Sequence, residues 1–180
     1  SPRLDYGVCS SPSGVHRMAY WEWGDPSNKK VLLWVHGLTR TGRDFDALAQ
    51  ALSSEYRVIC PDIVGRGKSD FLVDPDSYIV PQYVADIFTL IARLQPTTLD
   101  WVGTSMGGLI GLGVAGALIN LQRLHAWDTD HLLNSSWAVP FRRMVLNDVG
   151  PVISAEGLAR IGNYIGDELF FDSFEQAVEH

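Results

Sequence analysis

The sequence has few cysteines and no excess of basic residues, and each shortage excludes a class of protein. Only Cys9 and Cys60 occur among 180 residues, so no disulfide framework is predicted. Lysine and arginine number 14 against 21 aspartate and glutamate residues, which gives a formal net charge of -7. Such a chain lacks a basic surface for phosphate backbones or anionic lipids, so neither nucleic acid nor a membrane is an expected partner.

Long apolar runs are also missing. No uncharged run is long enough to cross a bilayer, and the N-terminus lacks the basic-then-apolar order of a secretion signal. We therefore expect a soluble, cytoplasmic protein. The composition, 46% hydrophobic and 19% charged, is typical of an ordinary globular domain with one core.

Short apolar segments alternate with stripes of helical spacing along the chain. After a hairpin suggested by alternating residues at 17–23, strands are predicted at 31–35, 56–60, 98–102 and 144–147. Helical spacing of apolar residues fills the intervals, with Pro81 near the start of one helix. This order predicts an α/β fold with a doubly wound, mostly parallel sheet and an N-terminal hairpin.

Two later segments fit this alternation less well. Residues 119–140 show no single period, and we interpret them as an insertion in a core that spans 1–153. Amphipathic helices are predicted from residue 154 onward.

A serine-centred turn follows the strand predicted at 98–102. Gly103, Ser105 and Gly107 form the pattern GxSxG, between an apolar strand and a helix of small residues. A serine in so sharp a turn is held in a strained conformation, and flanking glycines avoid collisions with neighbouring elements. The pattern predicts Ser105 as a nucleophile at the sheet edge. The alternative is a serine that only caps the following helix.

A second turn opens at the same edge of the predicted sheet. His36 and Gly37 follow the strand at 31–35, and ligands of parallel sheets bind beyond the carboxyl ends of the strands. Acyl transfer needs two preorganised N–H donors, and we predict those of Leu38 and Met106 as the oxyanion hole. The alternative is a plain turn whose histidine is satisfied by the backbone.

No phosphate or metal site is expected. Arg66 and Lys68 lie in a glycine-rich loop after the strand at 56–60, but the GxxxxGK[ST] spacing of a phosphate-binding loop is absent. One group of residues could suggest a metal site, and it consists of His125, Asp128, Asp130 and His131. However, two histidines in a polar loop are more often solvated than bound to a metal. We expect no metal and no cofactor, and we place His16 on the surface of the hairpin.

Three motifs in this order resemble the α/β-hydrolase superfamily over residues 18–152. They are His36-Gly37, the segment 61–69 with Asp62, and Gly103 to Gly107, each after a predicted strand. Residues 146–151 resemble the branch of esterase-like and carbon–carbon-bond hydrolases. The resemblance implies a Ser-acid-His triad and a helical cap, whose beginning would be residues 154–180.

In this family the acid and the histidine follow the nucleophile on later loops. Asp148 is the candidate acid, with a turn-forming role as an equal alternative. The later histidines, His125, His131 and His180, do not follow a recognisable strand. We therefore expect the chain to stop before the late strands, and an unfinished cap to favour self-association into a homo-oligomer.

The sequence favours a serine hydrolase that cleaves a small carboxylic ester through an acyl-enzyme. Two alternatives stay open, a carbon–carbon-bond hydrolase of the same fold and a noncatalytic protein that keeps the pocket without the base. Epoxide and haloalkane hydrolysis are disfavoured, because those reactions need a carboxylate where Ser105 stands.

Overall fold

The chain begins with an antiparallel hairpin. The structure is a computed structural model that describes residues 1–125 and 141–149. Strand β1 (Arg3–Ser11) pairs with β2 (Gly14–Trp23) along its whole length. Strand β2 then continues antiparallel to β4 (Arg57–Pro61), so the hairpin joins the main sheet as the alternation at 17–23 predicts.

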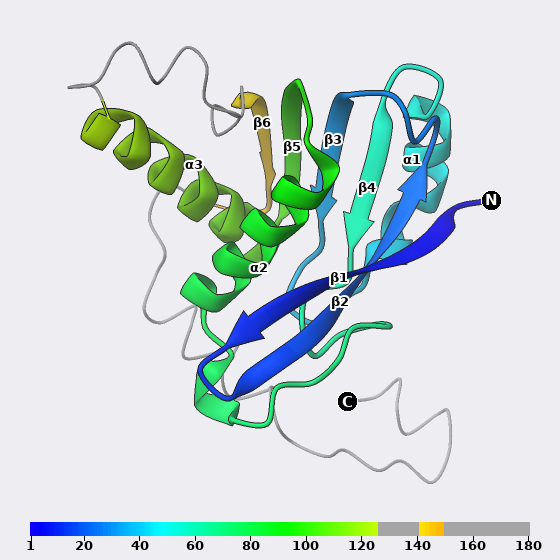
Figure 1. Cartoon of the computed structure of the whole chain (residues 1–180). Helices are drawn as coiled ribbons and strands as arrows, with labels where there is room; N and C mark the ends of the chain where they lie inside the picture. Colours follow the sequence, from blue (N-terminus) through cyan, green and yellow to red (C-terminus); the bar gives the residue numbers. More distant parts are fainter. Residues whose placement is uncertain (126–140, 150–180) are drawn as a thin grey trace, which may run out of the picture. The chain divides into compact units, whose positions relative to one another are not determined.

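The main sheet is parallel. Strands β3 (Lys30–Val35), β4, β5 (Thr98–Thr104) and β6 (Phe141–Asn147) run in one direction, and the sheet order is β1-β2-β4-β3-β5-β6. The predicted α/β fold with a mostly parallel sheet is thereby confirmed. Strands β3 and β5 are neighbours at its centre (Figure 1), which brings the two predicted site turns to one edge.

Helices cover both faces of the sheet (Figure 1), as a doubly wound arrangement requires. Helix α2 (Val80–Leu94) and helix α3 (Met106–His125) pack on one face against Leu33 and Val35. Helix α1 (Asp46–Leu52), which follows the 3-10 turn η1 (Gly42–Phe45), packs on the other face against Leu32. Alternate residues of β3 thus pack into two separate hydrophobic cores, one on each face of the sheet, which explains why the apolar run of this strand is unbroken.

Helix α3 extends further than predicted. It continues to His125, so the first part of the segment interpreted as an insertion, 119–125, is helical, because this stretch contains no glycine or proline that would end the helix. The rest of that segment, 126–140, lies outside the described residues. Contacts divide the chain into Ser1–Val149 and Gly150–His180, and the cap predicted at 154–180 also lies outside the described part. None of the described helices combines the length and apolarity needed to cross a bilayer.

Candidate active site

Ser105 occupies a strained turn between β5 and α3. Its φ is 51°, in the left-handed region that a residue with a side chain rarely adopts. The Ser105 N–H donates to the carbonyl of Asn147 at 2.8 Å, and its own carbonyl accepts from the N–H of Gly108 at 2.9 Å. The strain expected from the GxSxG pattern is therefore present, and the side chain is only half-buried.

The flanking glycines are required by close approaches. A Cβ on Gly103 would lie 2.4 Å from the Gly107 carbonyl oxygen, and a Cβ on Gly107 would lie 2.1 Å from that of Val35. Both distances are far below a van der Waals contact. Trp101, fully buried in β5, also donates from Nε1 to the Gly107 carbonyl at 3.1 Å and holds the first turn of α3 against the sheet.

The turn after β3 lies against this serine. Val35 pairs with Gly103 in the parallel register, and a Cβ built on Gly37 would sit 3.7 Å from the Cβ of Ser105. Leu38 follows directly, with its side chain packed against the core. Met106 is the first residue of α3, where an N–H has no partner within the helix. The structure thus brings the two residues predicted to donate to an oxyanion into the neighbourhood of Ser105.

His36 is a structural histidine. Its Nδ1 donates to the carbonyl of Gly37 at 2.6 Å, and its Nε2 accepts from the N–H of Ile63 at 3.0 Å. These partners fix one neutral tautomer. Burial lowers the pKa of His36, partly offset by the Gly37 carbonyl. Both ring nitrogens are occupied, so His36 supports the loops and is not the catalytic base.

Asp62 organises the loop after β4. Its carboxylate accepts from the N–H of Gly42 at 2.7 Å, the N–H of Lys68 at 2.9 Å and the indole of Trp21 at 3.3 Å. Gly67, with φ 55°, leaves room for this carboxylate, since a Cβ there would lie 2.2 Å from Asp62 Oδ2. The sequence marked Asp62 only as part of a motif, although a buried carboxylate directly after a strand is a signal for such an anchor.

The end of β6 reaches the same edge of the sheet. Asn147 pairs with Thr104, and the next residue, Asp148, has φ 58° and is exposed. The role of Asp148 as a triad acid stays a prediction. Of the two histidines whose side chains are described, His36 is occupied and His16 belongs to the hairpin, so the described residues contain no base for Ser105.

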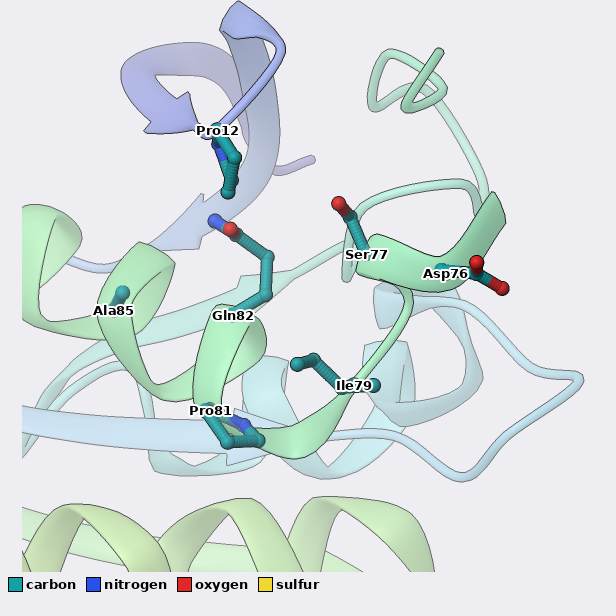
Figure 2. Close-up of a pocket in the computed structure, with 7 residues that line it drawn as sticks. All are labelled: Pro12, Asp76, Ser77, Ile79, Pro81, Gln82 and Ala85. Carbon is teal, nitrogen blue, oxygen red and sulfur yellow. The ribbon is translucent and has the colours of Figure 1, made fainter. Parts of the chain in front are cut away.

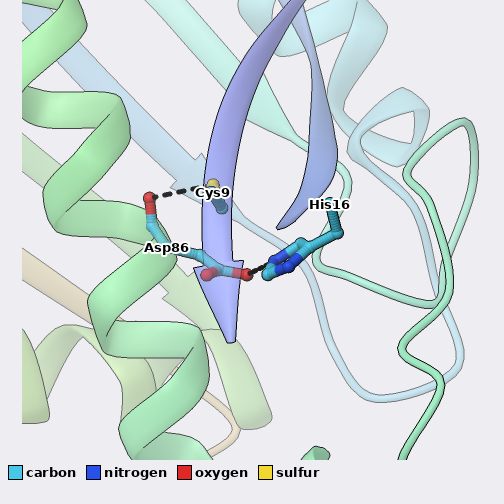
Figure 3. Close-up of side chains that lie close together, drawn as sticks. All are labelled: Cys9, His16 and Asp86. Atoms are coloured by element: carbon cyan, nitrogen blue, oxygen red, sulfur yellow. Dashed lines mark hydrogen bonds and ion pairs between the residues drawn. The ribbon is translucent and has the colours of Figure 1, made fainter. Parts of the chain in front are cut away.

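The placement of His16 on the hairpin surface was wrong. The side chain is buried, and its Nε2 lies 2.7 Å from Oδ2 of Asp86 in α2, with Cys9 beside them (Figure 3). Gln82 Nε2 donates to the other oxygen of Asp86 at 2.7 Å. The hairpin packs against α2, and the polar pair is buried in that contact. Asp86 satisfies Nε2 of His16, whereas Nδ1 has no hydrogen-bond partner among the described residues.

Cys9, His16 and Asp86 are also close enough together to hold a metal ion. Potential ligand atoms of Cys9, His16 and Asp86 lie within 4.8 Å of one another. However, His16 and Asp86 are bonded to each other, and burial raises the pKa of the Cys9 thiol to about 12, whereas zinc binds a thiolate. We interpret the group as a cross-link between β1, β2 and α2. Both cysteines are free, as the sequence predicts.

A shallow pocket lies elsewhere, between the hairpin turn and the start of α2. Pro12, Ser77, Pro81 and Gln82 are among the residues that line it (Figure 2). None of the predicted site residues contributes to its wall. The pocket is therefore separate from the turn that carries Ser105.

Comparison with known proteins places the chain in a family. Residues 30–126, more than half of the chain, match the family model described as "alpha/beta hydrolase fold". The chain belongs to the α/β-hydrolase family, as the three turn motifs indicated. This agrees with the mostly parallel sheet and with the glycine-flanked turn at Ser105.

Two sequence relatives and one solved structure are similar to the chain. The chain is similar to a 3-hydroxybutyrate-oligomer hydrolase of Cupriavidus necator, with 51% identity over all of the chain and 55% of that protein. A serine hydrolase-like protein of Danio rerio is 33% identical over 53% of the chain and 29% of its own length. The crystal structure of an α/β hydrolase from Novosphingobium aromaticivorans is 35% identical with a TM-score of 0.67, over 92% of this chain and 50% of that one. The chain thus spans about half the length of the 3-hydroxybutyrate-oligomer hydrolase and of the α/β hydrolase structure that it matches.

Proposed function

We propose that the protein containing these residues is a serine hydrolase that cleaves short 3-hydroxybutyrate esters through an acyl-enzyme. One observation carries the proposal: Ser105 has a φ of 51° in a strand-to-helix turn whose flanking glycines cannot bear side chains. Such a turn aims a serine hydroxyl outward beyond the strand end. The 51% identity to a 3-hydroxybutyrate-oligomer hydrolase supports the choice of ester.

The reaction follows from the groups at this edge. Ser105 Oγ attacks the ester carbonyl carbon while a base removes its proton, and the N–H groups of Leu38 and Met106 stabilise the resulting oxyanion. The C–O bond to the leaving alcohol breaks, and that alcohol takes up the proton. Water then attacks the acyl-enzyme and releases a free carboxylic acid and the Ser105 hydroxyl. The family order assigns the base to a histidine, which the described residues do not include.

The test is hydrolysis of purified 3-hydroxybutyrate dimer and trimer by the protein that contains these residues, followed by chromatography of the released monomer. We expect turnover by the wild type. In Ser105→Ala the rate of hydrolysis should fall by about 10³-fold or more, because the other catalytic groups cannot act without the nucleophile. Ser54→Ala, an exposed serine after α1, is the matched control and should keep full activity. Equal turnover by Ser105→Ala, or faster cleavage of a vinylogous diketone than of the ester, contradicts the proposal.

A further inference from the structure

Arg66 contacts both residues that carry the proposed oxyanion donors. Its Nε donates to the carbonyl of Leu38 at 2.9 Å, and its Nη2 lies 3.8 Å from the sulfur of Met106. Leu38 belongs to the loop after β3, and Met106 begins α3. One guanidinium from the loop after β4 therefore bridges the two segments on either side of the site.

The arginine is itself held in place. Its Nη1 donates to the carbonyl of Val64 at 2.9 Å and to Tyr83 Oη at 3.3 Å. The guanidinium also lies over the ring of Tyr83, 5.3 Å from its centroid, and Tyr83 is buried in α2. The guanidinium of Arg66 is thus held by α2 and by its own loop. It cannot follow a displacement of Leu38 without losing these hydrogen bonds.

The loop that carries Arg66 has little freedom. Gly65 has φ 80°, and the Arg66 N–H donates to the carbonyl of Ile63 at 2.9 Å. Ile63 in turn donates to His36, whose other nitrogen holds Gly37. Three loops at the strand ends are therefore joined in one network.

We propose that Arg66 is a positioning residue that keeps the N–H groups of Leu38 and Met106 at a fixed separation, an inference that rests on the proposed function. A guanidinium has five N–H donors, and most of those of Arg66 already have partners within the protein, which favours a positioning role over substrate binding. Four of them point to the Leu38 carbonyl, the Val64 carbonyl, the Tyr83 hydroxyl and the Met106 sulfur. A guanidinium so occupied has little left to offer a substrate.

The inference predicts a particular kinetic signature. Donors that act on the oxyanion stabilise the transition state and not the bound ester, so their displacement lowers kcat and leaves KM nearly unchanged. Loss of one such donor lowers kcat by about 10²–10³-fold. We expect Arg66→Lys, which keeps the charge but loses the fork, to lower kcat by about 10 to 100-fold because it misplaces donors without removing them.

The experiment measures kcat and KM of the protein that contains these residues on p-nitrophenyl butyrate, together with inhibition by an alkyl trifluoromethyl ketone, which forms a tetrahedral oxyanion adduct with serine. Arg66→Lys should lose affinity for the ketone in proportion to kcat/KM. Lys68→Met, an exposed cation of the same loop, is the matched control and should match the wild type in both measurements. Tyr83→Phe, which removes only the hydroxyl that anchors Nη1, should lower kcat by a smaller factor.

The outcomes separate the two proposals. A wild type that does not hydrolyse the ester and does not bind the ketone overturns the proposed function and this inference with it. An active wild type beside a folded Arg66→Lys with unchanged kcat and ketone affinity overturns the positioning role alone, as does an effect confined to KM. If Arg66→Lys does not fold, Tyr83→Phe decides, and unchanged kinetics in that variant overturn the inference.

Discussion

A Cβ atom placed on Gly37 would lie 3.7 Å from the Cβ atom of Ser105, at an ordinary contact distance. The loop after β3 and the turn after β5 thus face each other directly. Gly37→Ala should therefore fold with nearly wild-type stability, because the new methyl group has room. It should also lower kcat/KM, since that methyl group takes space beside the nucleophile.

This first prediction is checked by thermal unfolding together with ester hydrolysis. We expect a melting temperature within a few degrees of the wild type and a fall in kcat/KM of up to about 10²-fold, the cost of a misplacement of about 1 Å at the reacting atoms. Wild-type kinetics in Gly37→Ala would show that substrate does not approach Ser105 from this side.

A second prediction contrasts two glycines of α3. In Gly107→Ala the Cβ would meet the Val35 carbonyl oxygen at 2.1 Å, so α3 must shift, at a cost of about 1–3 kcal/mol or more in the free energy of unfolding. Among the residues that the structure describes, none has an atom within 4 Å of a Cβ built on Gly116. Gly116→Ala should stabilise the chain by about 0.5–1 kcal/mol through helix propensity. Chemical denaturation measures both, and destabilisation of similar size in the two variants would contradict the close approach.

A third prediction concerns the Asp62 carboxylate. Asp62→Asn replaces one acceptor oxygen by an NH₂ group, so either the Gly42 or the Lys68 N–H loses its acceptor in a buried site. The expected loss in the free energy of unfolding is about 1–3 kcal/mol. Asp44→Asn removes an exposed pair with Arg40 and should change it by less than about 1 kcal/mol. An Asp62→Asn protein as stable as Asp44→Asn would refute the anchoring role.

A fourth prediction follows from His36. Burial holds its pKa below the ordinary value of 6.5, so the folded state binds fewer protons than the unfolded state as the pH falls below that value. Its contribution to stability is then complete above about pH 6.5 and is lost as the pH falls through the folded-state pKa. As the pH falls below about 6.5, the free energy of unfolding should decline by more in the wild type than in His36→Gln. Parallel pH profiles for the two proteins would contradict this assignment.

Much of the fold and of the candidate site follows from local patterns. Unbroken apolar runs mark the parallel strands, and glycine spacing marks the turn at Ser105, because both reflect contacts within a few residues. The strand order then brings Gly37 and Ser105 together, since neighbouring parallel strands end at one edge.

Contacts between distant residues were beyond the reach of the sequence. His16 was placed on the surface because its partner, Asp86, lies 70 residues further along the chain. The alternation of residues in β2 could have indicated that His16 is buried, because His16 lies on the same face of the strand as the buried Met18 and Tyr20. In the sequence, Arg66 was only part of a glycine-rich loop without the spacing of a phosphate-binding loop, and no role was predicted for it. Its acceptor, the carbonyl of Leu38, belongs to another loop, 28 residues away.

The most direct test of the account is covalent labelling of the protein that contains these residues by a fluorophosphonate, with the modified peptide identified by mass spectrometry. A fluorophosphonate reacts with an activated serine and not with ordinary surface hydroxyls. The account predicts stoichiometric modification of Ser105 in the wild type and none in Ser105→Ala. A folded, ester-cleaving wild type labelled at another serine, or not labelled, would contradict Ser105 as the nucleophile.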